Sequence, residues 1–338
     1  MRNRKIGGSR PAIRRALAVA LATALACGTA MAQEAPGRAP LAAAPAPGAL
    51  QVWPVQGRVY VIAGAGQNVV VQVGESAIEV VNAGAEGATP GVLAAIRQLS
   101  RKPIQFVIET SADSDAVGGS MELAKAGHMN TGQPGEPAGA AVLAQLNVLS
   151  RLTGLNLPGV KLPTDSFADE WSFFNDEAVL LKHAPAAHSD GDSWVFFRRS
   201  DVIVTAPFFE PERYPVIDTA KGGSIGGTLD ALNDIIATMV PRENEEGGTY
   251  VVPARGRVCD HTDIVNYRDA LTIIRDRVAY YAGKGMSLEQ VLAQKPSADY
   301  DGIYGSEEGP WTTPMFLEAV YKGVKATAAR GRKSGVAK

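Results

Sequence analysis

The chain has 338 residues, of which 46% are hydrophobic and 20% are charged, and its formal net charge is −2. This length and balance are typical of a globular protein with room for one large domain or two smaller ones. The near-neutral charge provides no electrostatic basis for binding nucleic acid or an anionic membrane surface, so neither is an expected partner.

The N-terminal residues have the pattern of an export signal. A basic start precedes an apolar run, 16–26, that is too short to span a bilayer. Small residues in Ala30-Met31-Ala32 fit a signal-peptidase site, which predicts a signal peptide over 1–32 and a periplasmic or secreted protein with no membrane span after cleavage. Two other routes match less well, because Arg14-Arg15 lacks the flanks of a twin-arginine signal and Cys27 follows a poor lipoprotein sequence.

The next segment, 33–51, is rich in Ala and Pro and predicts a disordered linker, with the folded domain expected over 52–322. Three β-branched runs separated by glycine predict a meander of strands. These runs are 59–62, 69–73 and 77–81. Thr89-Pro90 predicts the start of a helix, and the apolar run 104–108 is typical of a buried strand.

The second half also contains a group of strands followed by a group of helices, after one further helix and a loop. A helix is predicted over 138–152, then a long loop over 154–166 that is a candidate lid. Three runs with strand character come next, and then four with helical periodicity. These are 179–182, 194–197 and 202–204, followed by 227–239, 262–282, a segment opening at 287 and another opening at 313. The basic tail, 323–338, is predicted to be flexible.

Polar residues and two glycines follow the strand predicted at 104–108, in the sequence Thr110-Ser111-Ala112-Asp113-Ser114-Asp115-Ala116-Val117-Gly118-Gly119. This decapeptide resembles the metal-binding loop of the metallo-β-lactamase fold superfamily. That loop reads Thr-His-x-His-x-Asp-His-x-Gly-Gly, and its histidines hold zinc. The residues that keep this frame are Thr110, Asp115, Gly118 and Gly119. The residues that replace the three histidines are Ser111, Asp113 and Ala116.

Other segments extend the resemblance over about 59–321, in the manner of an exported bacterial subgroup. The sequence 185–192 resembles the third ligand motif of the family and places His188 on a ligand position. Asn82, Pro207 and Arg255 stand where the family has an aspartate, a bridging carboxylate and the last histidine. The resemblance implies an α+β fold, a four-layer αβ/βα sandwich of two mixed β-sheets flanked by helices, with the site at the sheet edges.

A catalytic zinc ion needs about three protein ligands in addition to water. Of the ligand set that the resemblance implies, only Asp115 and His188 remain in register, and Asp113 is a candidate oxygen substitute. Arg255 carries a permanent positive charge that repels a cation and attracts a carboxylate. We therefore predict no resident cofactor and an ion pair from Arg255 to Asp113 or Asp115. Zinc held by Asp113, Asp115 and His188 is the alternative.

The predicted function is that of an exported pseudoenzyme, with a polar cleft that binds an unknown small molecule or protein, or with a scaffold role. The expected cleft residues are Asp113, Asp115, His188, Asp190 and Arg255. Asp115 and His188 are the best candidates for any catalytic role. Phe208, Phe209 and the 154–166 loop are expected as apolar walls.

Several alternatives stay open. One is a divergent hydrolase of the same superfamily, acting on a lactam, lactone, ester or phosphoester through one weakly held metal. Another is a metal-free triad of Ser111 or Ser114 with His188 and Asp115, although no nucleophile elbow accompanies it. A third is a purely local role, with Asp115 capping the following helix. The remaining candidates are predicted to be structural or surface residues, namely His128, His183, His261 and Cys259.

Overall fold

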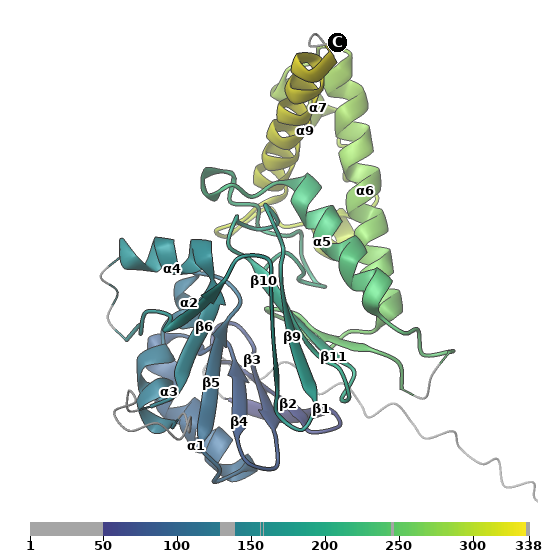
Figure 1. Cartoon of the computed structure of the whole chain (residues 1–338). Helices are drawn as coiled ribbons and strands as arrows, with labels where there is room; N and C mark the ends of the chain where they lie inside the picture. Colours follow the sequence, from purple (N-terminus) through teal and green to yellow (C-terminus); the bar gives the residue numbers. More distant parts are fainter. Residues whose placement is uncertain (1–49, 129–138, 156, 158, 245–246, 336–338) are drawn as a thin grey trace, which may run out of the picture. The chain divides into compact units, whose positions relative to one another are not determined.

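The computed structural model describes residues 50–128, 139–155, 157, 159–244 and 247–335 (Figure 1). The predicted signal peptide, Cys27 and nearly all of the 33–51 linker lie outside these described residues. Within the described part, no helix combines the length and the apolar character that crossing a bilayer requires.

Seven strands form the first sheet, in the order β1-β2-β3-β4-β5-β6-β7. They are β1 (Gln51–Gln56), β2 (Val59–Ala63), β3 (Val69–Val73), β4 (Ile78–Val81), β5 (Ile104–Glu109), β6 (Ala141–Gln145) and β7 (Asp165–Phe167). The first four pair antiparallel, which confirms the predicted meander, and β4 to β7 pair parallel. Because parallel strands end at the same edge, the loops after β4 and β5 are brought together.

Five strands form the second sheet, in the order β12-β11-β10-β9-β8. They are β8 (Glu170–Phe174), β9 (Ala178–His183), β10 (Ser193–Phe197), β11 (Val202–Thr205) and β12 (Tyr250–Val252). Only β11 and β12 pair parallel among these. The polar loops that follow β9, β11 and β12 carry His188, Glu210 and Arg255.

The described helices are α1 (Thr89–Leu99), α2 (Ser114–Val117), α3 (Ser120–Ala126), α4 (Leu146–Thr153), α5 (Ile225–Thr238), α6 (His261–Gly283), α7 (Leu288–Ala293), α8 (Asp301–Tyr304) and α9 (Thr313–Gly335), with short 3-10 turns at Glu86–Ala88 and Thr219–Lys221. Local sequence explains several of the starts. Reciprocal capping boxes open α6, through Asp260 and Asp263, and α7, through Ser287 and Gln290. Proline stands in the first turn of α1.

Alternating side chains of the strands supply three apolar cores and hence four layers. Val70 of β3 and Val204 of β11 lie in the core between the sheets. Val69 and Val71 face a second core with α1 and α3, and Ile203 faces a third with α5, α6 and α9. Figure 1 shows the two groups of helices on opposite sides of the paired sheets. The predicted four-layer αβ/βα sandwich is confirmed.

The structure corrects two predicted elements. The 138–152 helix is a buried strand, β6, followed by α4, because a parallel strand buried on both faces has no alternation to distinguish it from a helix. The 154–166 segment is anchored to α3 through Gly159 O and Lys161 N, and it ends in β7. Separately, α9 continues into the 323–338 segment as far as Gly335, and the predicted flexibility of that segment stays a prediction.

Candidate functional site

The 110–119 loop is fixed to the end of β4 by Asn82. The Asn82 Oδ1 atom accepts the Thr110 N–H at 3.2 Å and the Thr110 hydroxyl at 2.8 Å. Asn82 has a φ of 61°, a left-handed conformation that asparagine tolerates better than most residues. Asn82 therefore has a structural role at this edge of the first sheet, because it anchors Thr110.

The glycine pair that ends this loop is required by close packing. A Cβ atom on Gly118 would lie 2.5 Å from Glu86 N, and one on Gly119 would lie 2.5 Å from Ala83 O. Real side chains do not occupy such positions, so the backbone of the loop lies directly against the 83–86 segment. This packing fixes the positions of Asp113 and Asp115 at the edge of the first sheet where β5 ends.

Arg255, in the loop after β12, joins the two sheets. Its guanidinium donates to Asp115 from the first sheet and, at 2.5 Å, to Oε1 of Glu210 from the second. Glu210 is almost fully buried, with 2% of its side chain exposed, and it also pairs with Arg213. The predicted partner Asp115 is therefore observed, and Glu210 is a second partner that sequence analysis missed.

Asn68 holds Arg255 in position through the backbone of its loop. The Asn68 side chain donates to Pro253 O at 2.9 Å and to Gly256 O at 3.1 Å, and its N–H donates to Ala254 O at 2.7 Å. Burial lowers the pKa of Arg255, but the charges of Glu210 and Asp115 raise it, and the resulting pKa is above the ordinary value for arginine. The charge on this side chain is thus permanent.

Gln67 links the two aspartates of the loop. Its buried side-chain amide donates to Asp113 Oδ2 and to Asp115 Oδ1, both at 3.3 Å. The Gln67 carbonyl oxygen has no hydrogen-bond partner among the described residues. Asp113 and Asp115 are therefore neighbours, but Arg255 hydrogen-bonds only to Asp115 of the two.

His188 lies between two carboxylates. Its Nδ1 atom is 3.4 Å from Asp192 Oδ1, and its Nε2 atom is 3.8 Å from Asp113 Oδ2. Burial lowers the pKa of His188, whereas Asp192, Asp113 and Asp218 raise it, and the net pKa is above the ordinary value for histidine. Asp192 is fully buried and accepts the N–H and the hydroxyl of Ser189, each at 2.8 Å.

Asp190 contacts different residues from those that the other predicted cleft residues contact. Its carboxylate pairs with Arg151 of α4 at 2.5 Å, and its carbonyl accepts His183 Nε2 at 2.8 Å and Asn147 at 2.9 Å. Within the described part of the chain, Asp190 makes no hydrogen bond or ion pair with Asp113, Asp115 or Arg255. The structure brings four of the five predicted residues together and leaves Asp190 beside them.

Phe208 and Phe209 do not form the apolar walls that were predicted for the cleft. Phe208 and Phe209 are completely buried in the core beneath α6, where Phe209 packs edge-on against Tyr267 with ring centroids 5.1 Å apart. They follow β11 on the side of the second sheet that the helices cover, so their apolar character serves packing. The 154–166 loop packs Leu157 and Val160 against the small core under α2 and α4.

The donor groups do not fit a zinc centre. Asp115 is engaged by a guanidinium, and only Asp113 and His188 remain to contribute ligands. Among the described residues, no three His, Cys, Asp or Glu side chains are grouped so that they could hold a metal ion. A serine triad is not assembled in the described part either, because the ring nitrogens of His188 contact Asp192 and Asp113 and neither Ser111 nor Ser114 hydrogen-bonds to them.

Comparison with known proteins rests on structure alone. No protein-family model matches the sequence, and no curated protein matches it. A metallo-beta-lactamase from Pontibacter korlensis superposes with a TM-score of 0.52 at 13% identity, over 66% of this chain and 99% of the other. The stereoselective inverting sec-alkylsulfatase Pisa1 from Pseudomonas sp. superposes with a TM-score of 0.61 at 12% identity, over 81% of this chain and 50% of the other.

This chain has the metallo-β-lactamase fold. The DIM-1 metallo-beta-lactamase gives a similar match, with a TM-score of 0.51 at 12% identity over 66% of this chain and 97% of the other. The chain spans only about half of the alkylsulfatase, so the likeness there is to a part of a longer protein. Because the sequence identities are this low, the neighbours show only that this chain shares their metallo-β-lactamase fold.

Two residues of the site gave little signal in the sequence. Gln67 lies 48 positions from Asp115, and Glu210 lies 45 positions from Arg255. Glu210 follows two phenylalanines that pack in a core, and a carboxylate in such an apolar setting needs a cationic partner. The need for a cationic partner was the one signal in the sequence, and it does not identify which arginine pairs with Glu210.

Proposed function

We propose that this protein is an exported pseudoenzyme of the metallo-β-lactamase fold, with a metal-independent cleft that serves for binding or as a scaffold. The observation that carries the proposal is the ion pair of Arg255 with Asp115 and Glu210, carboxylates from the two sheets. A guanidinium between two carboxylates neutralises them without a metal ion, and it cannot lose its proton in a protein. Zinc binding at Asp115 would require this bridge to break.

Asp113 is the group we expect a ligand of the cleft to meet. Its carboxylate contacts the Gln67 amide and His188, and no lysine or arginine pairs with it among the described residues. Its side chain is 23% exposed. A hydrogen-bond donor or an ammonium group on a small molecule or a protein partner is the chemistry that suits this position.

Elemental analysis tests the absence of a resident metal. Protein purified from zinc-supplemented medium is expected to carry far less than one zinc per chain, and neither a chelator nor added zinc is expected to shift its melting temperature, because the bridge at Arg255 contains no metal. Stoichiometric zinc that disappears in an Asp115→Ala variant would contradict the proposal.

The hydrolase alternative is tested by turnover. Reporter lactams, lactones and phosphodiesters, together with an alkyl sulfate because a sec-alkylsulfatase is among the structural neighbours, are assayed with and without added zinc. We expect no zinc-dependent turnover above that of a His188→Ala variant. Turnover that requires zinc and is lost in His188→Ala would favour a divergent hydrolase with a weakly held metal.

A further inference from the structure

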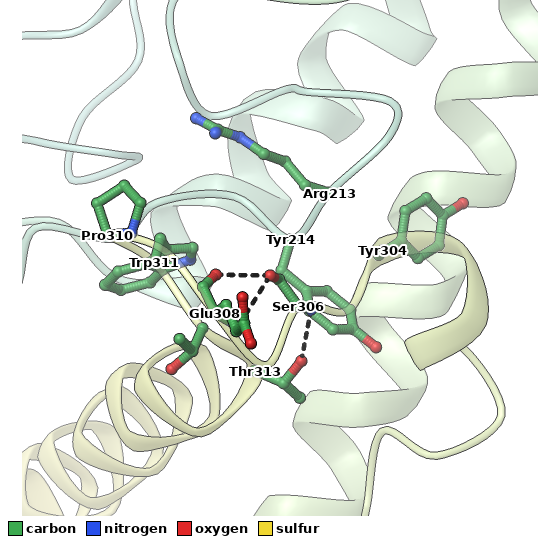
Figure 2. Close-up of a pocket in the computed structure, with 9 residues that line it drawn as sticks. Arg213, Tyr214, Tyr304, Ser306, Glu308, Pro310, Trp311 and Thr313 are labelled. Carbon is green, nitrogen blue, oxygen red and sulfur yellow. Dashed lines mark hydrogen bonds between the residues drawn. The ribbon is translucent and has the colours of Figure 1, made fainter.

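A cavity lies at the start of α9, and none of the predicted cleft residues lines it (Figure 2). Its volume is about 130 Å³. That volume is equivalent to about four water molecules at about 30 Å³ each, and it is below the roughly 300–1,000 Å³ of sites for drug-sized ligands. An occupant of this cavity is therefore a small molecule.

The walls of the cavity are formed before any ligand arrives. The Ser306 N–H donates to Thr313 Oγ1 at 3.0 Å, the Thr313 N–H donates to Ser306 O at 2.8 Å, and the Ser306 hydroxyl donates to Glu308 O at 2.7 Å. Tyr214 stacks on Phe316 with ring centroids 4.3 Å apart. The hydrogen bonds order the 306–313 loop internally and the stacking orders the aromatic side of the cavity, so binding costs little further ordering of the protein.

Three polar groups among the lining residues retain hydrogen-bonding capacity for a ligand, although Arg213 already pairs with Glu210 and Glu308 is exposed to solvent. Arg213 uses only its Nε atom, for Glu210, and its terminal nitrogens make no hydrogen bond to any described residue. The Glu308 carboxylate has no ion pair or hydrogen bond in the described part. The buried indole nitrogen of Trp311 also has no hydrogen-bond partner there. The lining thus offers a cation, an anion and a hydrogen-bond donor, and these three groups do not bond to one another.

We propose that this cavity binds a small zwitterion of the α-amino-acid type. Its carboxylate would be recognised by the terminal nitrogens of Arg213 and the Trp311 indole, since a guanidinium fork matches carboxylate geometry. Its ammonium group would be recognised by Glu308 and by the face of an aromatic ring. A simple carboxylate lacks the attraction of Glu308, and a simple amine meets the charge of Arg213, so a molecule with both groups is favoured.

This site is independent of the proposed pseudoenzyme role. A ligand carboxylate on the terminal nitrogens of Arg213 leaves the Nε contact with Glu210 in place. The bridge from Glu210 to Arg255 is therefore undisturbed. Occupancy of the cavity and the metal content of the cleft are separate measurements, and either result can stand without the other.

Calorimetric titration of the full chain with three matched probes tests the proposal. L-alanine carries both charges, propionate lacks the amine and ethylamine lacks the carboxylate. We expect alanine to bind with a Kd of about 1 mM and each of the other two to bind at least about tenfold more weakly. Saturable binding of propionate or ethylamine as tight as that of alanine, or no saturable binding of alanine, would overturn the proposal.

Two neighbouring glutamates provide a matched pair of variants. Glu308→Gln removes the carboxylate at the cavity, and Glu307→Gln removes one from an exposed residue that does not line it. Glu308→Gln is expected to weaken alanine binding about tenfold and to leave propionate unchanged, whereas Glu307→Gln changes neither. Equal effects of the two substitutions would place the interaction outside the cavity and overturn the assignment.

The indole resonances give the position of the ligand. The chain has four tryptophans, so an amide spectrum contains four indole N–H signals, and the one lost in Trp311→Phe belongs to the cavity. Alanine is expected to shift that signal and leave the other three in place. If the Trp311→Phe variant does not fold, the signal is assigned from the full-chain spectrum. Saturation by alanine with no shift of the Trp311 signal would contradict the proposal.

Discussion

Arg255 illustrates how the identity of one residue alters the chemistry of a whole edge of the fold. A guanidinium is planar and donates hydrogen bonds, whereas zinc accepts lone pairs in a tetrahedral arrangement. Asp115 and Glu210 can serve either kind of cation, but they cannot serve both at once. Glu210 is nearly buried, so leaving it without a cation costs free energy, and Arg213 and Arg255 share that role.

Replacing Arg255 with leucine is predicted to lower the free energy of unfolding by about 2–3 kcal/mol. This is below the roughly 3–5 kcal/mol for breaking a fully buried ion pair, because Arg213 still pairs with Glu210. Arg257→Leu is a matched control. The two arginines have 31% and 32% of their side chains exposed, but the partner of Arg257, Asp263, is 23% exposed against 2% for Glu210. Denaturant titrations should show the smaller loss for Arg257→Leu. Equal losses would mean that burial of Glu210 does not set the cost.

Glu109, at the end of β5, is a second charged residue in an unusual setting. Its side chain is fully buried. Burial raises the pKa of Glu109 to about 8, against the opposing effect of the Ser120 hydroxyl. The folded protein therefore holds a proton at this position that the unfolded chain releases at a lower pH.

The sign of the resulting pH dependence follows from proton linkage. Between the unfolded pKa of 4.5 and the folded pKa of about 8, the folded state binds more protons, so stability falls as pH rises. The Glu109 contribution to this loss is on the order of 3 kcal/mol between pH 5 and pH 7. Glu109→Gln should remove this contribution in denaturant titrations, whereas the contribution of Glu79, whose pKa burial also raises, remains. An unchanged slope would contradict the assignment.

At the scale of elements, the sequence predicted most strands and helices, but it was less successful where periodicity was absent. The β-branched runs of β2, β3 and β4 and the capping box of α7 have local signals, and they appear as predicted. β6 has none, because its residues are buried on both faces. The partners Gln67 and Glu210 are distant in sequence, so no local pattern could identify them.

The loop after β5 provides a test at this scale. Gly119→Ala would place a Cβ atom 2.5 Å from Ala83 O, a backbone atom that cannot move aside, and it should lower the free energy of unfolding by about 1–3 kcal/mol. Gly87→Ala is the control, because a Cβ atom there meets nothing within 4 Å. It should be neutral or stabilising by up to about 1 kcal/mol. Similar thermal shifts for both variants would show that the close approach is not what requires glycine.

At the scale of the whole molecule, polar groups tie the two sheets together at both ends of the apolar core between them. Arg255 does so at one end, through Asp115 and Glu210. Glu177, before the start of β9, does so at the other end, where it accepts from Gln72 of β3 at 3.3 Å and from the Ser200 N–H at 2.8 Å and hydroxyl at 2.7 Å. Side-chain hydrogen bonds and ion pairs therefore join the two sheets at both ends of this core.

Because these two ties share no partner, their contributions should add. Glu177→Gln is predicted to cost about 1–3 kcal/mol, since it weakens hydrogen bonds to a buried carboxylate. Combined with Arg255→Leu, it should give the sum of the single effects within about 0.5 kcal/mol. Arg255→Leu with Glu210→Gln should instead depart from additivity by about 1 kcal/mol or more, because those residues touch. Denaturant titrations of the three singles and two doubles measure both coupling energies, and strong coupling between positions 177 and 255 would mean that the ends of the sandwich do not act independently.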